Sequence, residues 1–404
     1  MLTKINMILR HSRNRRFIRH SREGGNPVLF PAIAILLAIL FGCVKTIRNE
    51  SVIYKDLHIA SDTVWKGNIF LEGIITVETG AVLTIKPGTS VNFLWRDTNN
   101  DGIGESGIYV FGTLLAEGEK ERLITFSSSS KTGKIQWEGL FFAASEGSPN
   151  ILSYCRFENA YRAIHSHFSK LKLENTTILN NSRGFQFQES EVEIKDSIFS
   201  DNYSALRFRD SMVEITNTII SRNYSAAHVL RSEIVFGENV IKNNYLEGIR
   251  IKESKGRIFN CSITGNRYGI LSYEGEVTID SNFIGKNELD GISSNNSKLT
   301  IDRNYILGNG LDGISLNNSG AVLSYNSIAE NKKFNLDNKG PLKIEAANNF
   351  WGCSNENEIE KSIEDGKDDN ISGKVNFVPF LSEPPDVVPA KAGNYGTGFP
   401  PSRE

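Results

Sequence analysis

An oxygen-rich loop is the sharpest local motif in the sequence. It runs from Asp97 to Glu105 as Asp-Thr-Asn-Asn-Asp-Gly-Ile-Gly-Glu. Oxygen donors at positions 1, 3 and 5, a glycine at position 6 and an acid at position 9 match the first half of an EF-hand-type calcium loop. Ile108 stands where the bidentate glutamate would be, so a polar turn is the alternative. We expect a structural Ca²⁺ ion with these ligands: Asp97, Asn99, Asp101, Glu105 and the carbonyl of Ile103.

A basic stripe is the second feature that could do chemistry. Arg207 and Arg209, then His228, then Arg250 and Lys252 recur at outward positions of successive strand-like segments. On adjacent strands such side chains lie about 5 Å apart, so their repulsion favours an anion such as a uronate or a sulfated sugar. The alternative is a solvated charged face that is partly neutralised by nearby acids, namely Glu189, Asp210 and Glu253.

Beside the stripe, Tyr203, Tyr224 and Tyr245 recur at intervals of 21 residues. This spacing predicts a stacked aromatic column, which would be either a platform for sugar rings or packing against a neighbouring loop.

Asp290 and Asp312 form a further pair, each directly before a glycine. Two neighbouring carboxylates suit a retaining glycosidase, but stacked turn aspartates explain the spacing without catalysis. We therefore assign no catalytic residue and keep this pair as the weak candidate.

A repeat of 21 or 22 residues positions all of these side chains. It is marked by asparagines that follow an apolar residue three positions earlier, and they are Asn181, Asn202, Asn223, Asn244, Asn266, Asn287, Asn309 and Asn331. Between them, segments of 3 to 5 residues alternate apolar and polar side chains, as in Val192-Glu193-Ile194, which is typical of strands. Strands this short must stack on their equivalents in neighbouring repeats. The sequence therefore predicts an all-β, right-handed, single-stranded parallel β-helix of about twelve coils with a short C-terminal cap.

The turns of this solenoid should be held by polar ladders. Buried turn asparagines can hydrogen-bond to one another along the axis. A second corner is expected to carry another such set, which consists of Asn175, Asp196, Asn217, Asn260, Asn282, Asn304 and Asn326. Cys155, Cys261 and Cys353 are expected to be single buried thiols, with one disulfide left open as an alternative.

The repeats resemble those of right-handed parallel β-helix proteins of the pectate-lyase-like superfamily, including the periplasmic NosD-like group. The opening at Trp65-Lys66-Gly67 and the closing Asn348-Asn349-Phe350-Trp351-Gly352 share this character. The resemblance implies the fold but not an activity, because this fold carries lyases, hydrolases, adhesins and non-catalytic modules. Arg250-Ile251-Lys252 matches a triplet of polygalacturonases, but their partner motifs are absent, so we interpret the match as coincidental.

The N-terminal region predicts export. A stretch rich in arginine precedes an apolar run at 27–42 that is short for a membrane span, as in secretory signals. It ends in Leu40-Phe41-Gly42-Cys43, which resembles a bacterial lipobox, although Phe41 departs from the usual small residue. We therefore expect lipidation of Cys43 and attachment to the outer membrane; an uncleaved anchor or an ordinary signal is the alternative. The predicted divisions are a leader at 1–43, a linker at 44–63, the β-helix at 64–353, a cap at 354–382 and a disordered tail at 383–404.

These features favour a cell-envelope lipoprotein that binds carbohydrate or serves as a structural module without catalysis. A polysaccharide lyase or glycoside hydrolase is one alternative, and a spacer or adhesin is another. The 404-residue chain carries 45 Lys and Arg against 47 Asp and Glu, a net charge of −2. Such a balance gives no field that attracts nucleic acid, so we expect a polysaccharide or anionic glycan, and a membrane through Cys43, as the partners.

Overall fold

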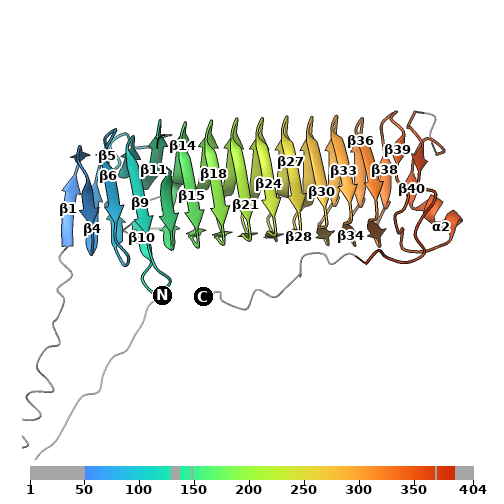
Figure 1. The fold of residues 1–404 in the computed structure, drawn as a ribbon, viewed down its shortest axis with the longest axis horizontal. Helices are drawn as coiled ribbons and strands as arrows, with labels where there is room; N and C mark the ends of the chain where they lie inside the picture. The colour runs from blue at the N-terminus through green and yellow to red at the C-terminus, as the bar shows by residue number, and fades with distance from the viewer. Residues whose placement is uncertain (1–50, 129–136, 146, 148, 369–370, 387–404) are drawn as a thin grey trace, which may run out of the picture. The chain divides into compact units, whose positions relative to one another are not determined.

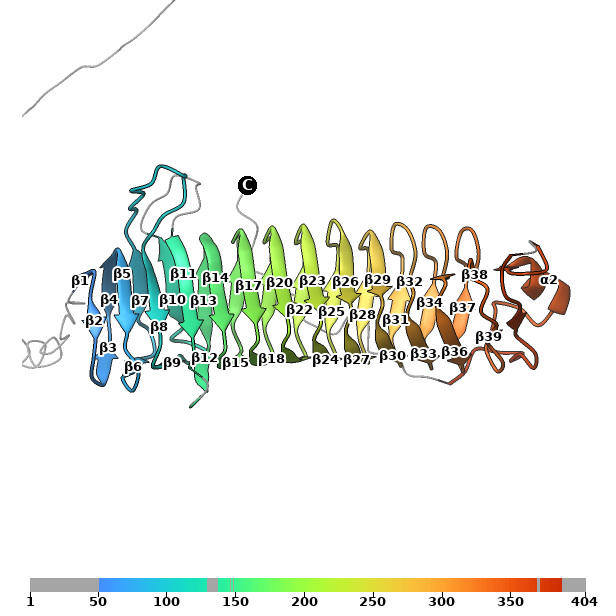
Figure 2. The same ribbon diagram turned by 90° about the horizontal axis from the view of Figure 1, so that it is seen from above.

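Short parallel strands make up almost all of the structure, a computed structural model that describes residues 51–128, 137–145, 147, 149–368 and 371–386. Successive strands belong in turn to three sheets, so that every third strand along the chain pairs with the next. Figures 1 and 2 show the resulting stack of coils, which runs from β1 to the region of β40. The predicted parallel β-helix is confirmed.

Each coil contributes one strand to each of three parallel sheets, which we call sheets A, B and C. The 13 strands of sheet A are β1 (Ser51–Lys55), β4 (Asn68–Glu72), β7 (Ser90–Phe93), β10 (Ile124–Ser128), β13 (Cys155–Glu158), β16 (Thr177–Leu179), β19 (Ile198–Ser200), β22 (Ile219–Ser221), β25 (Val240–Lys242), β28 (Ser262–Thr264), β31 (Phe283–Gly285), β34 (Tyr305–Leu307) and β37 (Ser327–Ala329).

The 14 strands of sheet B are β2 (His58–Ile59), β5 (Ile74–Val77), β8 (Gly107–Val110), β11 (Trp137–Ala143), β14 (Ala160–His167), β17 (Arg183–Gln188), β20 (Ser204–Arg209), β23 (Ser225–Leu230), β26 (Glu247–Lys252), β29 (Tyr268–Tyr273), β32 (Ile292–Asn295), β35 (Ile314–Asn317), β38 (Leu336–Asn338) and β40 (Ile363–Glu364).

The 14 strands of sheet C are β3 (Thr63–Trp65), β6 (Val82–Ile85), β9 (Thr113–Glu117), β12 (Asn150–Ser153), β15 (Lys170–Glu174), β18 (Glu191–Lys195), β21 (Met212–Thr216), β24 (Glu233–Gly237), β27 (Lys255–Phe259), β30 (Glu276–Asp280), β33 (Lys298–Asp302), β36 (Gly320–Ser324), β39 (Ile344–Glu345) and β41 (Val375–Asn376).

Side-chain alternation explains why these segments are strands. In β15 and β18, every second residue is buried and the others are exposed. The inward residues stack in register, as Leu173, Ile194 and Ile215 do on sheet C, and form one apolar core along the axis. Flat aromatic pairs fill the wider early coils, where Phe93 lies on Trp137 with ring centroids 3.9 Å apart. Burial on this scale is the main stabilising contribution to the stack.

The predicted asparagine ladder lies at the corner between sheets A and B. Asn223 is 2 % exposed, and its Oδ1 accepts hydrogen bonds from the backbone nitrogen of Asn202 (2.9 Å) and from Asn202 Nδ2 (3.0 Å). Its own Nδ2 donates to Asn244 Oδ1 (3.0 Å) and to the carbonyl of Phe199 (3.1 Å). Each amide is therefore satisfied, and this is possible only while the neighbouring coils are in register.

The set predicted for the second corner is partly wrong. At the corner between sheets C and A, Asn282, Asn304 and Asn326 do form a buried ladder, which Asn239 and Asn349 extend. Asn175, Asp196, Asn217 and Asn260 instead occupy the preceding position, where the backbone is left-handed with φ between 47° and 51°. Asn and Asp are the residues that adopt this conformation most readily, which explains why the two neighbouring sites look alike in sequence.

Hydroxyl and thiol side chains fill the remaining ladder positions. At the corner between sheets B and C, the backbone nitrogen of Ser190 donates to Ser211 Oγ (3.2 Å), and that hydroxyl donates to the carbonyl of Arg209 (2.8 Å). This serine ladder was not predicted from the sequence. Cys155 and Cys261 occupy ladder positions between sheets C and A; both are buried and free, and burial raises the pKa of both thiols.

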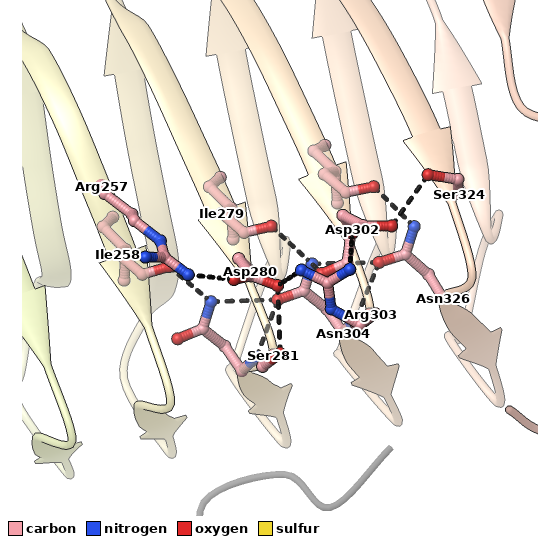
Figure 3. A network of polar contacts seen from close by, with 12 residues as sticks. Arg257, Ile258, Ile279, Asp280, Ser281, Asp302, Arg303, Asn304, Ser324 and Asn326 are labelled. Carbon is pink, nitrogen blue, oxygen red and sulfur yellow. Dashed lines mark hydrogen bonds and ion pairs between the residues drawn. The ribbon is translucent and has the colours of Figure 1, made fainter. Parts of the chain in front are cut away.

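A buried carboxylate joins several coils at the C–A corner (Figure 3). Asp280 is 4 % exposed and pairs with Arg257 and with Arg303, whose Nη2 lies 2.7 Å from Asp280 Oδ1. Burial alone would raise the pKa of Asp280, but hydrogen bonds from Arg257, Ser281 and Arg303 hold it below its ordinary value. The two arginines come from β27 and from the residue after β33, so the carboxylate links coils on both sides of its own.

The two ends of the stack differ from the predicted divisions. The first coil is built by β1, β2 and β3 and so includes residues assigned to the linker at 44–63. At the other end, α2 (Glu356–Lys361) begins at the cap residue Asn355 and buries Ile359, beside the buried Trp351 and Phe377. β40 and β41 pair with β38 and β39, so part of the predicted cap continues the sheets. In the predicted tail, the carbonyl of Pro385 accepts a hydrogen bond from Tyr305 Oη (2.8 Å), and residues 387–404 lie outside the described residues.

Removing one rung of the A–B ladder tests its contribution to stability. We expect Asn223→Ala to lower the free energy of unfolding by about 2–3 kcal/mol, because buried donors of Asn202 lose their acceptor. Urea denaturation followed by circular dichroism measures the change. The exposed Glu214→Gln on β21 is the control and should change stability by less than about 0.5 kcal/mol. Equal effects of the two substitutions would contradict a stabilising role for the ladder.

Candidate functional site

The outer face of sheet B carries the most varied chemistry in the molecule. Its strands are in parallel register, so outward residues form columns along the axis. One column consists of Tyr109, Phe141, His165, Gln186, Arg207, His228, Arg250, Leu271, Ser293, Ser315 and Asp337. A neighbouring column consists of Ala143, His167, Gln188, Arg209, Leu230, Lys252, Tyr273, Asn295 and Asn317. The face therefore changes along the axis from aromatic and histidine residues through cations to carboxylates.

The predicted basic stripe lies in the middle of this face. Arg207 pairs in register with His228, and His228 pairs with Arg250, on the adjacent strands β20, β23 and β26. Arg209 and Lys252 lie in the next column, separated by Leu230. A groove of about 330 Å³ is lined by all five predicted residues together with Gln186 and Gln188. We call this the basic groove; the structure brings together the side chains that the spacing indicated.

One acid that the sequence analysis missed neutralises part of the groove. Glu247 Oε1 lies 2.7 Å from His228 Nε2 and 3.3 Å from Arg250 Nη1. Burial alone would raise the pKa of Glu247, but the hydrogen bond from His228 and the charges of His228 and Arg250 lower it. Asp210 pairs with Arg209 at 3.4 Å and more closely with Arg231, and Glu253 lies 3.3 Å from Lys252.

Arg207 is the cation of the groove that lacks such a partner. Among the described residues, it forms no ion pair and no side-chain hydrogen bond. Partial desolvation, and then the charge of Arg183, lower the pKa of its guanidinium. An arginine placed beside another cation is stabilised by an anion from outside the protein.

The three predicted tyrosines do form a stacked column. Tyr203 and Tyr224 have ring centroids 4.6 Å apart with a 6° interplanar angle, and Tyr224 and Tyr245 are 5.1 Å apart at 17°. They stand at the A–B corner, next to the ladder asparagines and directly before the strands that carry the basic groove. Tyr203 is 62 % and Tyr245 68 % exposed, so the column is not covered by a neighbouring loop of the described chain.

Asp290 and Asp312 lie on adjacent coils near the C-terminal end of the same face. The backbone nitrogen of Asp312 donates to Asp290 Oδ1 (3.2 Å), and the nitrogen of Phe334 donates to Asp312 Oδ1 (3.2 Å). Asp337 joins them, and Lys339 Nζ lies 3.6 Å from Asp312 Oδ2 and 3.2 Å from Asp337 Oδ2. All three aspartates are buried. These contacts fit stacked turn aspartates, but burial and the charges of Asp337 and Asp290 also raise the pKa of Asp312 to about 6.

Two histidines that the sequence analysis did not single out extend the face in the other direction. His165 and His167, on β14, point outward with their Nε2 atoms 2.9 Å apart. They are in register with Gln186 and Gln188, and then with Arg207 and Arg209. The alternation His-Ser-His is itself a strand signal, and β14 aligns with β17 at a constant offset of 21 residues. Ala160 stands at the ladder position of this coil, where the later repeats have asparagine, so the asparagine pattern does not extend to it.

The predicted calcium ligands lie in the loop between β7 and β8, which projects beside the stack (Figure 2). Backbone nitrogens occupy several of their oxygens: Gly102 donates to Asp97 Oδ2 (3.1 Å), Asp101 to Asn99 Oδ1 (2.9 Å) and Ile103 to Asp101 Oδ1 (2.8 Å). Thr98 Oγ1 donates to Glu105 Oε2 (2.6 Å). Asp97 Oδ1 is buried without a hydrogen-bond partner. Within the described ranges, no group of three or more His, Cys, Asp or Glu side chains is arranged to hold a metal ion.

A larger hollow, of about 1610 Å³, lies elsewhere, along the corner between sheets B and C. Ion pairs between adjacent coils occupy its cations, as between Lys170 and Glu191 (2.8 Å), Lys255 and Glu233 (3.1 Å), and Lys298 and Glu276 (2.8 Å). Its lining holds seven Asp and Glu against four Lys and Arg, and this net negative charge disfavours an anionic ligand. We therefore regard the face of sheet B, and not the larger hollow, as the candidate site.

Comparison with known proteins identifies the fold. The family model described as "Right handed beta helix region" matches residues 204–360, and the chain is a right-handed parallel β-helix protein. No curated protein matches the sequence. In the part of the chain that the structure describes, no helix has the length and apolar character needed to cross a membrane.

Several solved structures are similar to this chain. A mutant of the periplasmic alginate epimerase AlgG is 15 % identical, with 72 % of this chain and 78 % of that chain covered and a TM-score of 0.49. The A-module of the Azotobacter vinelandii mannuronan C-5 epimerase AlgE6 is 12 % identical, with 79 % and 91 % covered and a TM-score of 0.34. The catalytic domain of a GH87 alpha-1,3-glucanase is 11 % identical, with 73 % and 63 % covered and a TM-score of 0.39.

The raised pKa of Asp312 predicts a specific pH dependence of stability. The folded state keeps this proton up to about pH 6, whereas the unfolded chain loses it near pH 3.8. The folded state therefore binds more protons at this carboxyl group between these values, so the contribution of Asp312 to the free energy of unfolding falls as pH rises from 4 to 6, by up to about 3 kcal/mol. Other carboxyl groups, such as Asp290 with a raised pKa and Asp280 with a lowered one, add their own pH dependence. In urea denaturation at pH 4 and pH 7, Asp312→Asn should therefore lose less stability, or gain more, than the wild type as pH rises. A variant with the same slope as the wild type would contradict this assignment.

Proposed function

We propose that the outer face of sheet B binds an anionic polysaccharide that lies along the axis of the coils. The observation that carries this proposal is the excess of cations in the basic groove. The cations that line it are Arg207, Arg209, Arg250 and Lys252. Glu247, Asp210 and Glu253 pair with its cationic side chains other than Arg207, which has no acid partner among the described residues. Arginine forms paired hydrogen bonds with carboxylate and sulfate groups, which a uronate or a sulfated sugar would supply.

The periodicity of the face suits a polymer better than a small anion. Adjacent strands of a sheet lie about 4.8 Å apart, so functional groups recur along the groove at a distance similar to the length of one sugar unit. The tyrosine column beside the groove offers stacked, exposed rings over three coils. Aromatic rings contact the apolar faces of sugars while their hydroxyls remain available for hydrogen bonds. We therefore place the ligand chain over β17, β20, β23 and β26.

Binding without catalysis is the role that these contacts support best. A glycoside hydrolase is the second candidate, and the raised pKa of Asp312 beside Asp290 favours it, because a general acid must keep its proton near neutral pH. Release of reducing ends from a panel of polysaccharides tests that candidate. Release that is lost in Asp290→Asn and in Asp312→Asn would replace the binding role by a catalytic one.

Two further proposals concern the loop between β7 and β8 and the lipidation of Cys43. The loop at 97–105 would bind Ca²⁺ through Asp97, Asn99, Asp101, Glu105 and the Ile103 carbonyl, and the buried Asp97 Oδ1 without a partner fits a cation ligand. Lipidation of Cys43, which lies outside the described residues, would hold the protein at the outer membrane.

Charge removal in the groove tests the binding proposal. We expect Arg207→Ala and Arg250→Ala each to weaken binding of an anionic polysaccharide by about tenfold, since each removes a charge-assisted contact. An array of uronate-containing and sulfated polysaccharides identifies the ligand, and isothermal titration calorimetry measures the affinity. Lys172→Ala, which removes a cation paired with Glu193 on sheet C, is the matched control and should bind like the wild type.

The opposite pattern would overturn the proposal. If no anionic polysaccharide on the array binds, the protein is better described as a spacer or adhesin. If Lys172→Ala weakens binding as much as Arg207→Ala does, the interaction depends on net charge and not on the groove.

Calcium should stabilise the loop measurably. At a free Ca²⁺ concentration about 100 times the dissociation constant, one site raises the free energy of unfolding by about 2.7 kcal/mol. We expect Asp97→Asn to abolish the gain in melting temperature, whereas the exposed Glu121→Gln should retain it. A wild-type melting temperature that is insensitive to Ca²⁺ would leave the loop as a polar turn.

A further inference from the structure

The histidine pair on β14 is a second cluster of polar groups on the face of sheet B. His165 and His167 lie two residues apart, and their Nε2 atoms form a hydrogen bond of 2.9 Å. One Nε2 must therefore carry a proton and the other must accept it, so the two imidazoles share one hydrogen in this contact. Phe141 packs against both rings, with centroids 5.0 Å from His165 and 5.8 Å from His167.

Cations surround this pair and keep it uncharged. Burial, and then the charges of Arg162, His167 and Arg183, lower the pKa of His165 to about 3. Burial also lowers the pKa of His167, where Glu189 opposes the effect and the charges of Arg209 and Arg162 add to it. Tyr109 and Glu138 are the other titratable groups beside His165, and Glu138 is paired with Arg162. Glu189 offsets only part of the burial and cationic charge at this pair, so a positive charge on it is favoured by a further anion from outside the protein.

A donor without an acceptor lies in the same place. The Nε of Arg162 is buried and has no hydrogen-bond partner, although the guanidinium pairs with Glu138 through Nη2. Arg162 and His165 line a hollow of about 130 Å³ with Tyr109, Glu138 and Phe141. A buried N–H group without an acceptor is costly, and a bound oxyanion would satisfy it.

This cluster is aligned with the basic groove. His165 is in register with Gln186, and Gln186 with Arg207; His167 follows the same path through Gln188 to Arg209. Two strand spacings, or about 10 Å, separate the histidines from the arginines. A polymer that occupies the groove and continues toward the N-terminal coils therefore passes over the two glutamines and reaches the histidine pair.

We propose that His165, His167 and Arg162 form a second anion subsite, which takes up one proton from solvent when a carboxylate or sulfate of the polysaccharide binds there. This inference rests on the proposed function, because the ligand is the same polysaccharide. The added proton goes to the Nδ1 of the ring whose Nε2 already carries hydrogen, and the resulting imidazolium keeps the hydrogen bond to its neighbour. The anion compensates the new charge beside Arg162, Arg183 and Arg209.

Proton uptake makes binding tighter at lower pH. Between the pKa of the free pair and its higher pKa in the complex, affinity falls as pH rises, by at most tenfold per pH unit for one proton. Isothermal titration calorimetry at pH 6.0, in two buffers with different ionisation enthalpies, measures the number of protons taken up. The probes are a hexamer of galacturonate and a sulfated heparin hexasaccharide, which present a carboxylate and a sulfate respectively.

Wild-type protein should take up a fraction of a proton that approaches one, and the double variant His165→Gln/His167→Gln should take up none while still binding through the basic groove. His58→Gln is the control. It alters an exposed histidine on β2 that pairs with Glu78, and it should retain both the affinity and the proton uptake of the wild type. His228→Gln tests whether the histidine of the basic groove contributes to proton uptake. The proposal requires that this variant still takes up a proton when the probe binds.

The outcomes separate the two proposals. Binding of either probe with no proton uptake, or with uptake that the double variant retains, overturns the histidine subsite and leaves the basic groove intact. Absence of binding by both probes overturns the proposed function, and the subsite with it. Circular dichroism of the double variant confirms that the coils remain folded.

Discussion

Buried polar side chains at the corners are the constraint on which the rest of the structure depends. A coil of 21 or 22 residues must turn three times, and each turn buries backbone groups that its own strands cannot satisfy. The asparagine, serine and mixed ladders supply the missing partners, and many of these come from a neighbouring coil, as when Asn223 accepts from Asn202 and donates to the carbonyl of Phe199. A coil alone would leave these groups unpaired, so each coil is stable only when the neighbouring coils have the same register.

The ladders and the core restrict inward and corner positions but leave the outer face of sheet B free to vary. Inward positions must be apolar and corner positions must be small or amide-bearing, but outward positions of sheet B meet no such demand. They change along the axis from Phe141 and His165 to Arg207 and Arg250 and then to Asp337 while the backbone repeats. A ligand that repeats at a similar distance can contact several coils, and its affinity then depends on the sum of modest contacts, not on one deep pocket.

Much of the fold was predictable from the sequence because the period is carried by buried residues with strict requirements. The A–B asparagine ladder, the basic groove and the tyrosine column follow from positions that repeat every 21 or 22 residues. The second corner was partly misassigned because ladder positions and left-handed positions both favour Asn and Asp, as Asn217 and Asn282 illustrate. Glu247 was missed because it lies in a coil with an extra residue, where the offset to the preceding strand changes from 21 to 22. The pair formed by His165 and His167 was missed because its coil has Ala160 in place of the ladder asparagine. The first coil, at β1, was missed because it precedes the regular repeats.

We expect an anionic chain to lie on sheet B and not in the larger, net acidic hollow at the B–C corner. Hydroxyl-radical footprinting with and without a bound anionic hexasaccharide compares the two surfaces directly, because exposed aromatic and sulfur-containing side chains mark both. The account predicts that the ligand protects Tyr203, Tyr224 and Tyr245 and leaves Phe168 and Met212 equally reactive. Protection of Phe168 and Met212 with unchanged tyrosines would contradict it.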